Sequence, residues 1–319
     1  MKASLLPVAM VTLLAMGCDI FNPHPTTRYA TSGQAQDVAA RNDTLFVAQG
    51  DSGLLFLDIS NPRSPRHLSR INMFSECRCL ALGASVVYVG LEEDAYALNL
   101  SDGGVHRVEP QGDSQTIAAL HEEPGRLFVA AADGISLFDV SNPGAPIPSR
   151  FIPVSGHPTG LARRDSRLFV SLRDWGVRVF NILPGDSFVL DTVRLGKRNR
   201  AEGVTVSEGG YCIISQADSG VVVYYSPSAD TVEWIGGGGG SNLATYAAAA
   251  SDGVEEVSIY TADSSMVTIH NIVNRPEKRS FSGETGFADF EGFTRRICRG
   301  GNGYVYTASG DAGVYIVRE

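Results

Sequence analysis

The stretch LFVAQGDSGLLFLDISNP, residues 45–62, holds two short apolar segments on either side of the turn sequence Gly-Asp-Ser-Gly. Apolar segments this short, bounded by glycine and aspartate, are typical of strands rather than helices. The short turn predicts that the two strands pair in antiparallel fashion. Asn61-Pro62 then predicts a turn before a polar outer strand, the position where a sheet tolerates proline.

The same pattern recurs along the chain. Clear copies are LFVAAADGISLFDVSNP at 127–143 and LFVSLRDWGVRVFNI at 168–182, and weaker copies continue to the C-terminus. Each copy has an aspartate in its turn: Asp51, Asp94, Asp133, Asp174, Asp218, Asp263 and Asp311. Successive aspartates are 39 to 48 residues apart. A repeat of this length made only of strand signals is typical of a β-propeller blade.

The repeats predict an all-β fold, a seven-bladed β-propeller of four-stranded antiparallel blades. The last unit ends at Glu319 after its third strand, whereas Thr27–Ser32 precedes the first inner strand and has the composition of an outer strand. We therefore expect this N-terminal strand to complete the last blade. Such closure removes the open sheet edges at which chains aggregate.

Residues 1–17 have the layout of a secretory signal, with Lys2 followed by an apolar run from Leu5 to Met16. The segment ends in Ala-Met-Gly before Cys18 and resembles the lipobox of bacterial lipoproteins. That resemblance implies an acylated Cys18; ordinary cleavage after Gly17 is the alternative. The expected organisation is a signal peptide at 1–17, a lipid-anchored tether at 18–26 and the propeller at 27–319. The protein would then be exported and anchored to the bacterial membrane, facing the periplasm or the cell surface.

In three of the repeat units, the third strand has a more specific sequence motif. Leu54–Asp58 (LLFLD), Ile135–Asp139 (ISLFD) and Val177–Asn181 (VRVFN) resemble the motif of LVIVD-repeat proteins, and Ser-Asn-Pro follows the first two. These proteins are exported bacterial and archaeal propellers. The resemblance implies the fold and export, and it implies no particular activity.

The net charge and the cysteine positions limit which partners and which covalent bonds the chain can have. The net charge of −9 argues against nucleic acid as a partner. Apart from Cys18, the cysteines are Cys77, Cys79, Cys212 and Cys298. Cys77 and Cys79 alternate along a predicted strand, so we expect both on one face. Their Cα atoms would lie about 6.5–7 Å apart, at the outer limit for a disulfide, which favours free buried thiols.

The sequence has no Gly-x-Ser-x-Gly elbow, no His-Glu-x-x-His motif and no paired zinc ligands, so no catalytic residue is predicted. The glycine run at 236–240 is interpreted as a flexible loop without a phosphate-binding context.

Binding residues are expected where inner strands begin, since those positions surround the mouth of the central channel. They are Gln34, Gln36, Glu76, Gln115, His157, Arg200, Glu202, Asn242 and Glu291. A basic cluster beside a tryptophan forms the candidate binding patch: His157, Arg173, Trp175, Lys197, Arg198 and Arg200. Tryptophan and arginine are enriched in binding hot spots, so this patch fits an anionic glycan, lipid headgroup or acidic protein surface.

Two functions remain open. The first is a non-enzymatic binding or scaffold module of the cell envelope, monomeric and without a cofactor, that binds a protein or glycan partner. The second is a calcium-dependent hydrolase resembling lactonases or esterases. In that alternative Ca²⁺ would be held by Glu76, Glu202, Asn242 and Glu291, whose oxygens have suitable chemistry.

Overall fold

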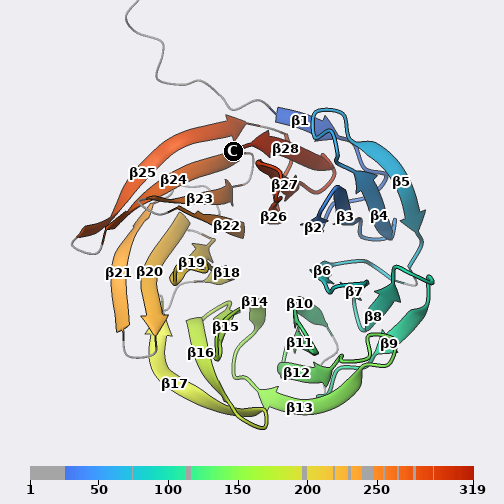
Figure 1. The fold of residues 1–319 in the computed structure, drawn as a ribbon, viewed down its shortest axis with the longest axis horizontal. Helices are drawn as coiled ribbons and strands as arrows, with labels where there is room; N and C mark the ends of the chain where they lie inside the picture. Colours follow the sequence, from blue (N-terminus) through green and yellow to red (C-terminus); the bar gives the residue numbers. More distant parts are fainter. Residues whose placement is uncertain are drawn as a thin grey trace, which may run out of the picture.

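The computed structural model describes residues 26–319 apart from 74, 113–115, 196–199, 218–219, 229–230, 239–246, 254–255, 264–265, 276–277 and 290. These residues form 28 strands in seven four-stranded antiparallel sheets, arranged as a ring around a central axis (Figure 1). The prediction of a seven-bladed β-propeller is confirmed. The described part of the chain contains no helix that could cross a membrane.

The first four blades follow the chain in order. Blade 1 contains β2 (Asp37–Arg41), β3 (Thr44–Ala48), β4 (Leu54–Asp58) and β5 (Arg66–Ile71). Blade 2 contains β6 (Cys79–Leu82), β7 (Val86–Gly90), β8 (Ala95–Asn99) and β9 (Val105–Val108). Blade 3 contains β10 (Ile117–Glu123), β11 (Arg126–Ala131), β12 (Gly134–Asp139) and β13 (Ile147–Pro153). Blade 4 contains β14 (Pro158–Arg164), β15 (Arg167–Leu172), β16 (Gly176–Leu183) and β17 (Ser187–Leu195).

The remaining blades complete the ring. Blade 5 contains β18 (Ala201–Val206), β19 (Tyr211–Gln216), β20 (Gly220–Ser228) and β21 (Thr231–Gly238). Blade 6 contains β22 (Ala247–Asp252), β23 (Glu256–Asp263), β24 (Met266–Arg275) and β25 (Lys278–Asp289). Blade 7 contains β26 (Arg296–Arg299), β27 (Tyr304–Ala308), β28 (Val314–Arg318) and, from the other end of the chain, β1 (Thr26–Tyr29).

The ring closes as the sequence predicts. β1 pairs antiparallel with β28, from Thr26 opposite Val317 to Tyr29 opposite Val314. Arg28 fastens the pair, since its Nε donates to the Ala312 carbonyl oxygen at 2.7 Å. Figure 1 shows β1 beside β28, although these strands come from opposite ends of the sequence.

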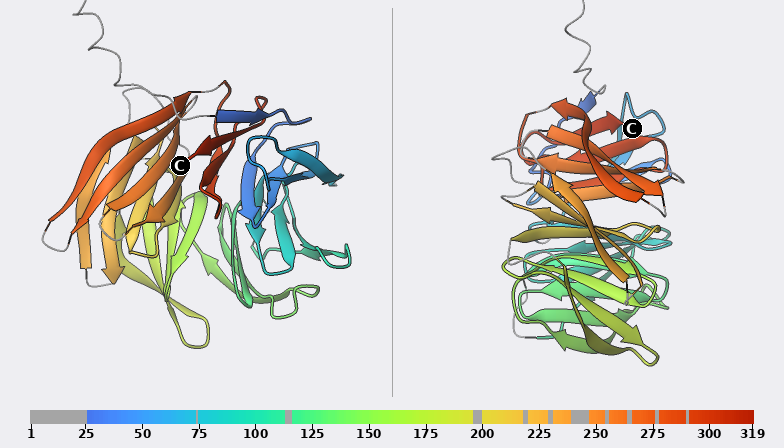
Figure 2. Two further views of the ribbon diagram at one scale, coloured as in Figure 1. Left: turned by 45° about the horizontal axis from the view of Figure 1, so that its top comes forward. Right: turned by 90° about the vertical axis from the view of Figure 1, so that its left-hand side faces the viewer.

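The propeller has two faces. We call the side that holds the turns with Asp51, Asp174 and Asp311 the upper face, and the opposite side, with the turns between first and second strands, the lower face. Figure 2 shows the ring from two further directions. Because β1 begins opposite the end of β28 and runs toward the Asp311 turn, the chain enters the propeller at the lower face.

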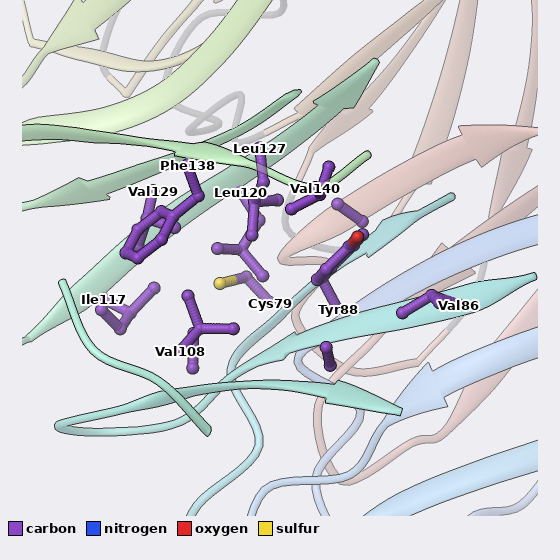
Figure 3. Close-up of a cluster of buried hydrophobic side chains, with 13 residues drawn as sticks. Cys79, Val86, Tyr88, Val108, Ile117, Leu120, Leu127, Val129, Phe138 and Val140 are labelled. Atoms are coloured by element: carbon purple, nitrogen blue, oxygen red, sulfur yellow. The ribbon is translucent and has the colours of Figure 1, made fainter. Parts of the chain in front are cut away.

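Apolar side chains fill the space between neighbouring blades, as expected when each blade is covered only by the next. Among the described residues there are seven such clusters, one at each blade interface. Figure 3 shows the cluster between blades 2 and 3, which contains Val86 and Tyr88 of β7 together with Val129 and Phe138 of blade 3. Another cluster joins blades 7 and 1 and thereby stabilises the closure.

Cys77 and Cys79 correct one expectation, because they lie on opposite faces of blade 2. Cys77 packs in the cluster shared with blade 1, and Cys79 packs in the cluster shared with blade 3. An irregularity explains the difference: the Arg78 N–H donates to the Gly90 carbonyl, while Cys79 is the residue paired with Gly90. An extra residue of this kind reverses the alternation of side chains. Both thiols are free and buried, and burial raises the pKa of each to about 12.

The glycine run is a second correction. Residues 236–238 belong to β21, where they pair with residues 221–223 of β20, and are not a loop. Gly236 has φ of +159°, close to the extended backbone of a strand, so the segment continues the sheet. Glycines 239 and 240 lie outside the described residues.

Candidate functional site

The central channel opens on the upper face into a cavity of about 570 Å³, which we call the entrance cavity. Its walls come from the beginnings of the inner strands and the turns above them, in blades 1 to 5 and 7. Its charged lining comprises Arg78, Arg173, Arg200, Arg295 and Arg296 together with Glu76 and Glu202. Among the described residues, five arginines therefore face two glutamates, in a chain whose net charge is −9.

Backbone bridges between blades position two of these walls. Ala35 pairs with Gly310 of blade 7 through hydrogen bonds of 2.9 and 3.0 Å, and Cys77 pairs with Gly50 of blade 1 in the same way. Ala35 and Cys77 are buried, so the residues on either side of each face the cavity, following the alternation of extended chain. This places Gln34 and Gln36 in the wall from blade 1, and Glu76 and Arg78 in the wall from blade 2.

Ion pairs occupy two of the arginines. Arg78 donates from Nη2 to Glu76 at 2.9 Å, and its Nη2 lies 3.3 Å from a carboxylate oxygen of Glu92. Gln36 also donates to Glu76, at 3.2 Å. In blade 5, Arg200 Nη2 lies 3.2 Å from Glu202 Oε1, an ion-pair distance without the alignment of a hydrogen bond. Both glutamates are thus already neutralised by neighbouring cations.

Arg173 and Arg295 are different. Both side chains are exposed, and within the described residues neither has an ion pair or a side-chain hydrogen bond. They come from blades 4 and 7 and line the same cavity. A guanidinium group that lines a cavity without a carboxylate partner is available to bind an anion from solution.

Arg296 narrows the lower end of the entrance cavity. Its Nη2 donates across the channel to the carbonyl oxygen of Thr159 in blade 4, at 3.1 Å. Arg296 also lines a second, smaller cavity of about 140 Å³ further along the inner strands, together with Asp37 and Cys79. Asp37 accepts backbone N–H bonds from Val38 and Leu80, both 2.8 Å long. Burial raises the pKa of Asp37 to about 6, although the charge of Arg296 and these two hydrogen bonds oppose the increase.

The structure places most of the predicted residues that it describes in two groups, one lining the entrance cavity and one beside it. The entrance cavity brings together Gln34, Gln36, Glu76, Arg173, Arg200 and Glu202. His157 and Trp175 lie beside it: the carbonyl oxygen of His157 accepts the Arg173 N–H at 3.0 Å, and Trp175, 49% exposed, packs over Gly156. Gln115, Lys197, Arg198 and Asn242, like Cys18, lie outside the described residues.

Glu291 is placed differently from the expectation. It is absent from the described lining of the cavity, and its side chain is 85% exposed at 3.6 Å from Arg28. The reason is that Glu291 lies five residues before β26, too early in the loop to reach the axis.

Sequence reasoning missed Arg78, Arg295 and Arg296, which supply three of the five arginines. A signal for Arg78 was present, because Glu76 and Arg78 flank Cys77 as Gln34 and Gln36 flank Ala35.

The calcium alternative gains no support from this geometry. Glu76 and Glu202 are paired with arginines, and Glu291 points elsewhere. Across the described residues, no three His, Cys, Asp or Glu side chains gather in a way suited to a metal ion. The neighbouring guanidinium groups would also repel a divalent cation.

The fold and the lined channel define the class as a seven-bladed β-propeller with a cavity on its axis. Residues 32–72, which comprise blade 1 and the loop that enters it, match the LVIVD repeat family. The resemblance of the motif is therefore confirmed, and the chain is a β-propeller that carries the LVIVD repeat.

Solved structures show the same fold at low sequence identity. The β-propeller domain of Cps50 (Swd1) from Myceliophteria thermophila aligns with a TM-score of 0.71 and 11% identity, covering 92% of this chain and all of that one. The computationally designed protein Ika8 aligns with a TM-score of 0.63 and 13% identity, covering 89% of this chain and 83% of that one. No curated protein matches the sequence significantly.

Proposed function

We propose that this protein is a non-enzymatic binding or scaffold module of the cell envelope, and that its entrance cavity binds an anionic group of a protein or glycan partner. The single observation that carries this proposal is the excess of arginine over glutamate in the cavity of an acidic chain. Arg173 and Arg295, without carboxylate partners among the described residues, would make the direct contacts.

Physical chemistry favours an anion over a structural role for these side chains. Clustered guanidinium groups repel one another, so an arrangement with unpaired cations costs free energy until a counter-charge is bound. Guanidinium groups bind carboxylate and phosphate through paired hydrogen bonds. The exposed ring of Trp175 beside the cavity offers an apolar contact for the rest of the partner.

The test is a ligand-observed NMR titration of the full-length protein in detergent with acetate, phosphate and sulfate. We expect saturable binding of at least one anion, weakened by added NaCl. The double variant Arg173→Gln/Arg295→Gln should lose this binding. The control is Arg63→Gln/Arg318→Gln, which changes two exposed arginines on the lower face and should leave it intact. Binding that persists in the first variant would refute the proposal.

We also propose that the protein is exported and anchored through lipid on Cys18. The chain enters the propeller at Thr26 on the lower face, so an anchor there would leave the entrance cavity pointing away from the membrane. Replacing Cys18 with alanine should move the protein from the membrane fraction to the soluble fraction. Cys212→Ala is the matched control, because it removes a buried thiol of blade 5 without touching the leader. Continued membrane association of Cys18→Ala would exclude the lipid anchor.

A further inference from the structure

We propose that the ligand of the entrance cavity is a terminal acidic sugar, a compact unit with one carboxylate on a hydroxylated ring that enters end-on. This inference rests on the proposed function and deepens it, because it names the chemical class that the same site binds. Four features of the cavity carry it: its narrowed lower end, the acidic residues on the upper face, the position of its unpaired cations and the polar character of its remaining walls.

The narrowed lower end limits what can enter. Arg296 spans the channel from blade 7 to the Thr159 carbonyl of blade 4, and the space beyond it is only about 140 Å³. Arg296 therefore narrows the passage toward the lower face. The 570 Å³ cavity opens on the upper face, so the site suits a small molecule or the end of a longer one that enters there.

The surroundings of the cavity disfavour an extended polyanion. Exposed carboxylates that do not line the cavity occupy turns of the upper face, at Asp51, Glu93, Asp174 and Asp311. An anionic polymer laid across this face would pass over these like charges. A single anionic group avoids that repulsion, because the cations lie nearer the axis.

The unpaired cations fix where the carboxylate of the ligand sits. Arg173 and Arg295 approach the cavity from blades 4 and 7, whereas the paired glutamates belong to blades 2 and 5. A carboxylate is therefore attracted to these two guanidinium groups, which have no carboxylate partner among the described residues. Near Glu76 and Glu202, whose charges are already balanced by Arg78 and Arg200, a hydroxyl group of the ligand could donate a hydrogen bond.

The rest of the lining matches a hydroxylated ring. Gln34, Gln36 and Thr116 supply amide and hydroxyl groups, and Gln36, only 8% exposed, is held in place by its hydrogen bond to Glu76. Phe293, 42% exposed, is the large apolar side chain that the described lining presents to solvent. One apolar surface among hydrogen-bonding groups suits the C–H face of a sugar ring.

The same lining fits a peptide terminus less well. A peptide terminus that ends in an apolar residue needs an enclosed apolar pocket beside the carboxylate site. In the entrance cavity the other large apolar lining residues, Ile117 and Pro158, are buried and offer little accessible surface. We therefore assign the ligand to the acidic sugars.

The experiment is a ligand-observed NMR titration of the full-length protein with D-glucuronate and D-galacturonate. The comparison ligands are D-glucose, D-galactose, acetate and the peptide Gly-Gly-Leu. We expect one uronate to bind about tenfold or more tightly than acetate and than its neutral sugar. Arg295→Gln should weaken that uronate about tenfold. Gln36→Leu should reduce its advantage over acetate. Arg63→Gln, on the lower face, is the matched control.

Other outcomes separate the two proposals. Acetate binding as tightly as both uronates would overturn the sugar assignment and leave the anion site standing. Gly-Gly-Leu binding more tightly than either uronate would assign the site to peptide termini instead. End-on entry would be overturned if the affinity of polygalacturonate increased with the number of its internal units and not with the number of its chain ends. Absence of binding by every anion would overturn the proposed function itself.

Discussion

The aspartates that end the third strands have a structural task. Asp58 accepts the N–H of Ser60 at 2.9 Å, and Asp139 accepts the N–H of Ser141 at 2.8 Å. Hydrogen bonds from Ser60, and then the neighbouring Arg66, lower the pKa of Asp58 to about 2. The final aspartate of the repeat thus closes the turn after its strand, and this accounts for its recurrence without any catalytic role.

The raised pKa of Asp37 predicts that the stability of the fold decreases as the pH rises. Its pKa is raised from the ordinary 3.8 to about 6, mainly by burial. Between pH 4 and 6 the unfolded chain therefore releases this proton while the folded chain retains it. Stability contributed by the protonated group is complete below pH 4 and falls as the pH rises toward 6, by roughly 3 kcal/mol for a shift of about two units.

Urea unfolding of the wild type and of Asp37→Asn at pH 4 to 7 measures this effect. The free energy of unfolding of the wild type, relative to the variant, should decrease across the window and then become constant. Asp58→Asn is the control, because a lowered pKa loses its contribution only as the pH falls toward 2. A flat difference between wild type and Asp37→Asn would contradict the raised pKa.

Two glycines in each upper turn of blades 1 and 7 have distinct roles. Gly310 has φ of +55° and forms the bridge to Ala35, and a Cβ there would find its nearest neighbour at 3.6 Å. Gly313 has φ of +90°, and a Cβ there would collide with the carbonyl oxygen of Tyr29 at the end of β1. Position 310 therefore requires only a left-handed backbone. Position 313 also requires a residue without a Cβ atom, because Tyr29 occupies that space.

This difference predicts unequal effects of alanine at the two sites. Gly310→Ala should destabilise the fold by about 1 kcal/mol, the usual cost of a left-handed alanine. Gly313→Ala should cost about 2 to 4 kcal/mol, because relief of the collision requires β1 to move away from the turn. Chemical denaturation of both variants tests the pair, and equal losses would show that β1 does not pack against Gly313.

The strands themselves could be predicted, because apolar segments and turn residues determine them locally. LLFLD is such a segment, and it forms β4 with the predicted bounds. The faces of Cys77 and Cys79 could not be predicted, since the extra residue at Arg78 depends on bridges to blade 1 and on the pairing of Gly90 within blade 2. Strand pairing between distant segments decides such details.

The entrance cavity exists only when the ring is closed. Its walls include Gln36 at the start of blade 1 and Arg295 at the start of blade 7, which are far apart in the sequence. Arg173 and Arg200 could be identified from their clustering in blades 4 and 5. Arg295 and Arg296 could not be identified. They reach the entrance cavity only when the ring closes, and Arg296 then donates across the axis to Thr159.

Closure by β1 gives the last prediction. Deleting Thr27–Ser32 removes most of β1, exposes the edge of β28 and eliminates the Arg28 hydrogen bond to Ala312. We expect a loss of about 3 to 5 kcal/mol, which lowers the melting temperature by roughly 10 °C for a domain of this size.

The control replaces Arg28 with alanine, which removes its side-chain contacts but keeps the backbone pairing of β1, and should cost about 1 kcal/mol. Circular dichroism melting of both variants measures the difference. Because blades 1 and 7 meet at the Ala35–Gly310 bridge beside the entrance cavity, the deletion should also weaken anion binding there. An unchanged melting temperature would mean that the apolar cluster between blades 7 and 1 maintains the ring without β1.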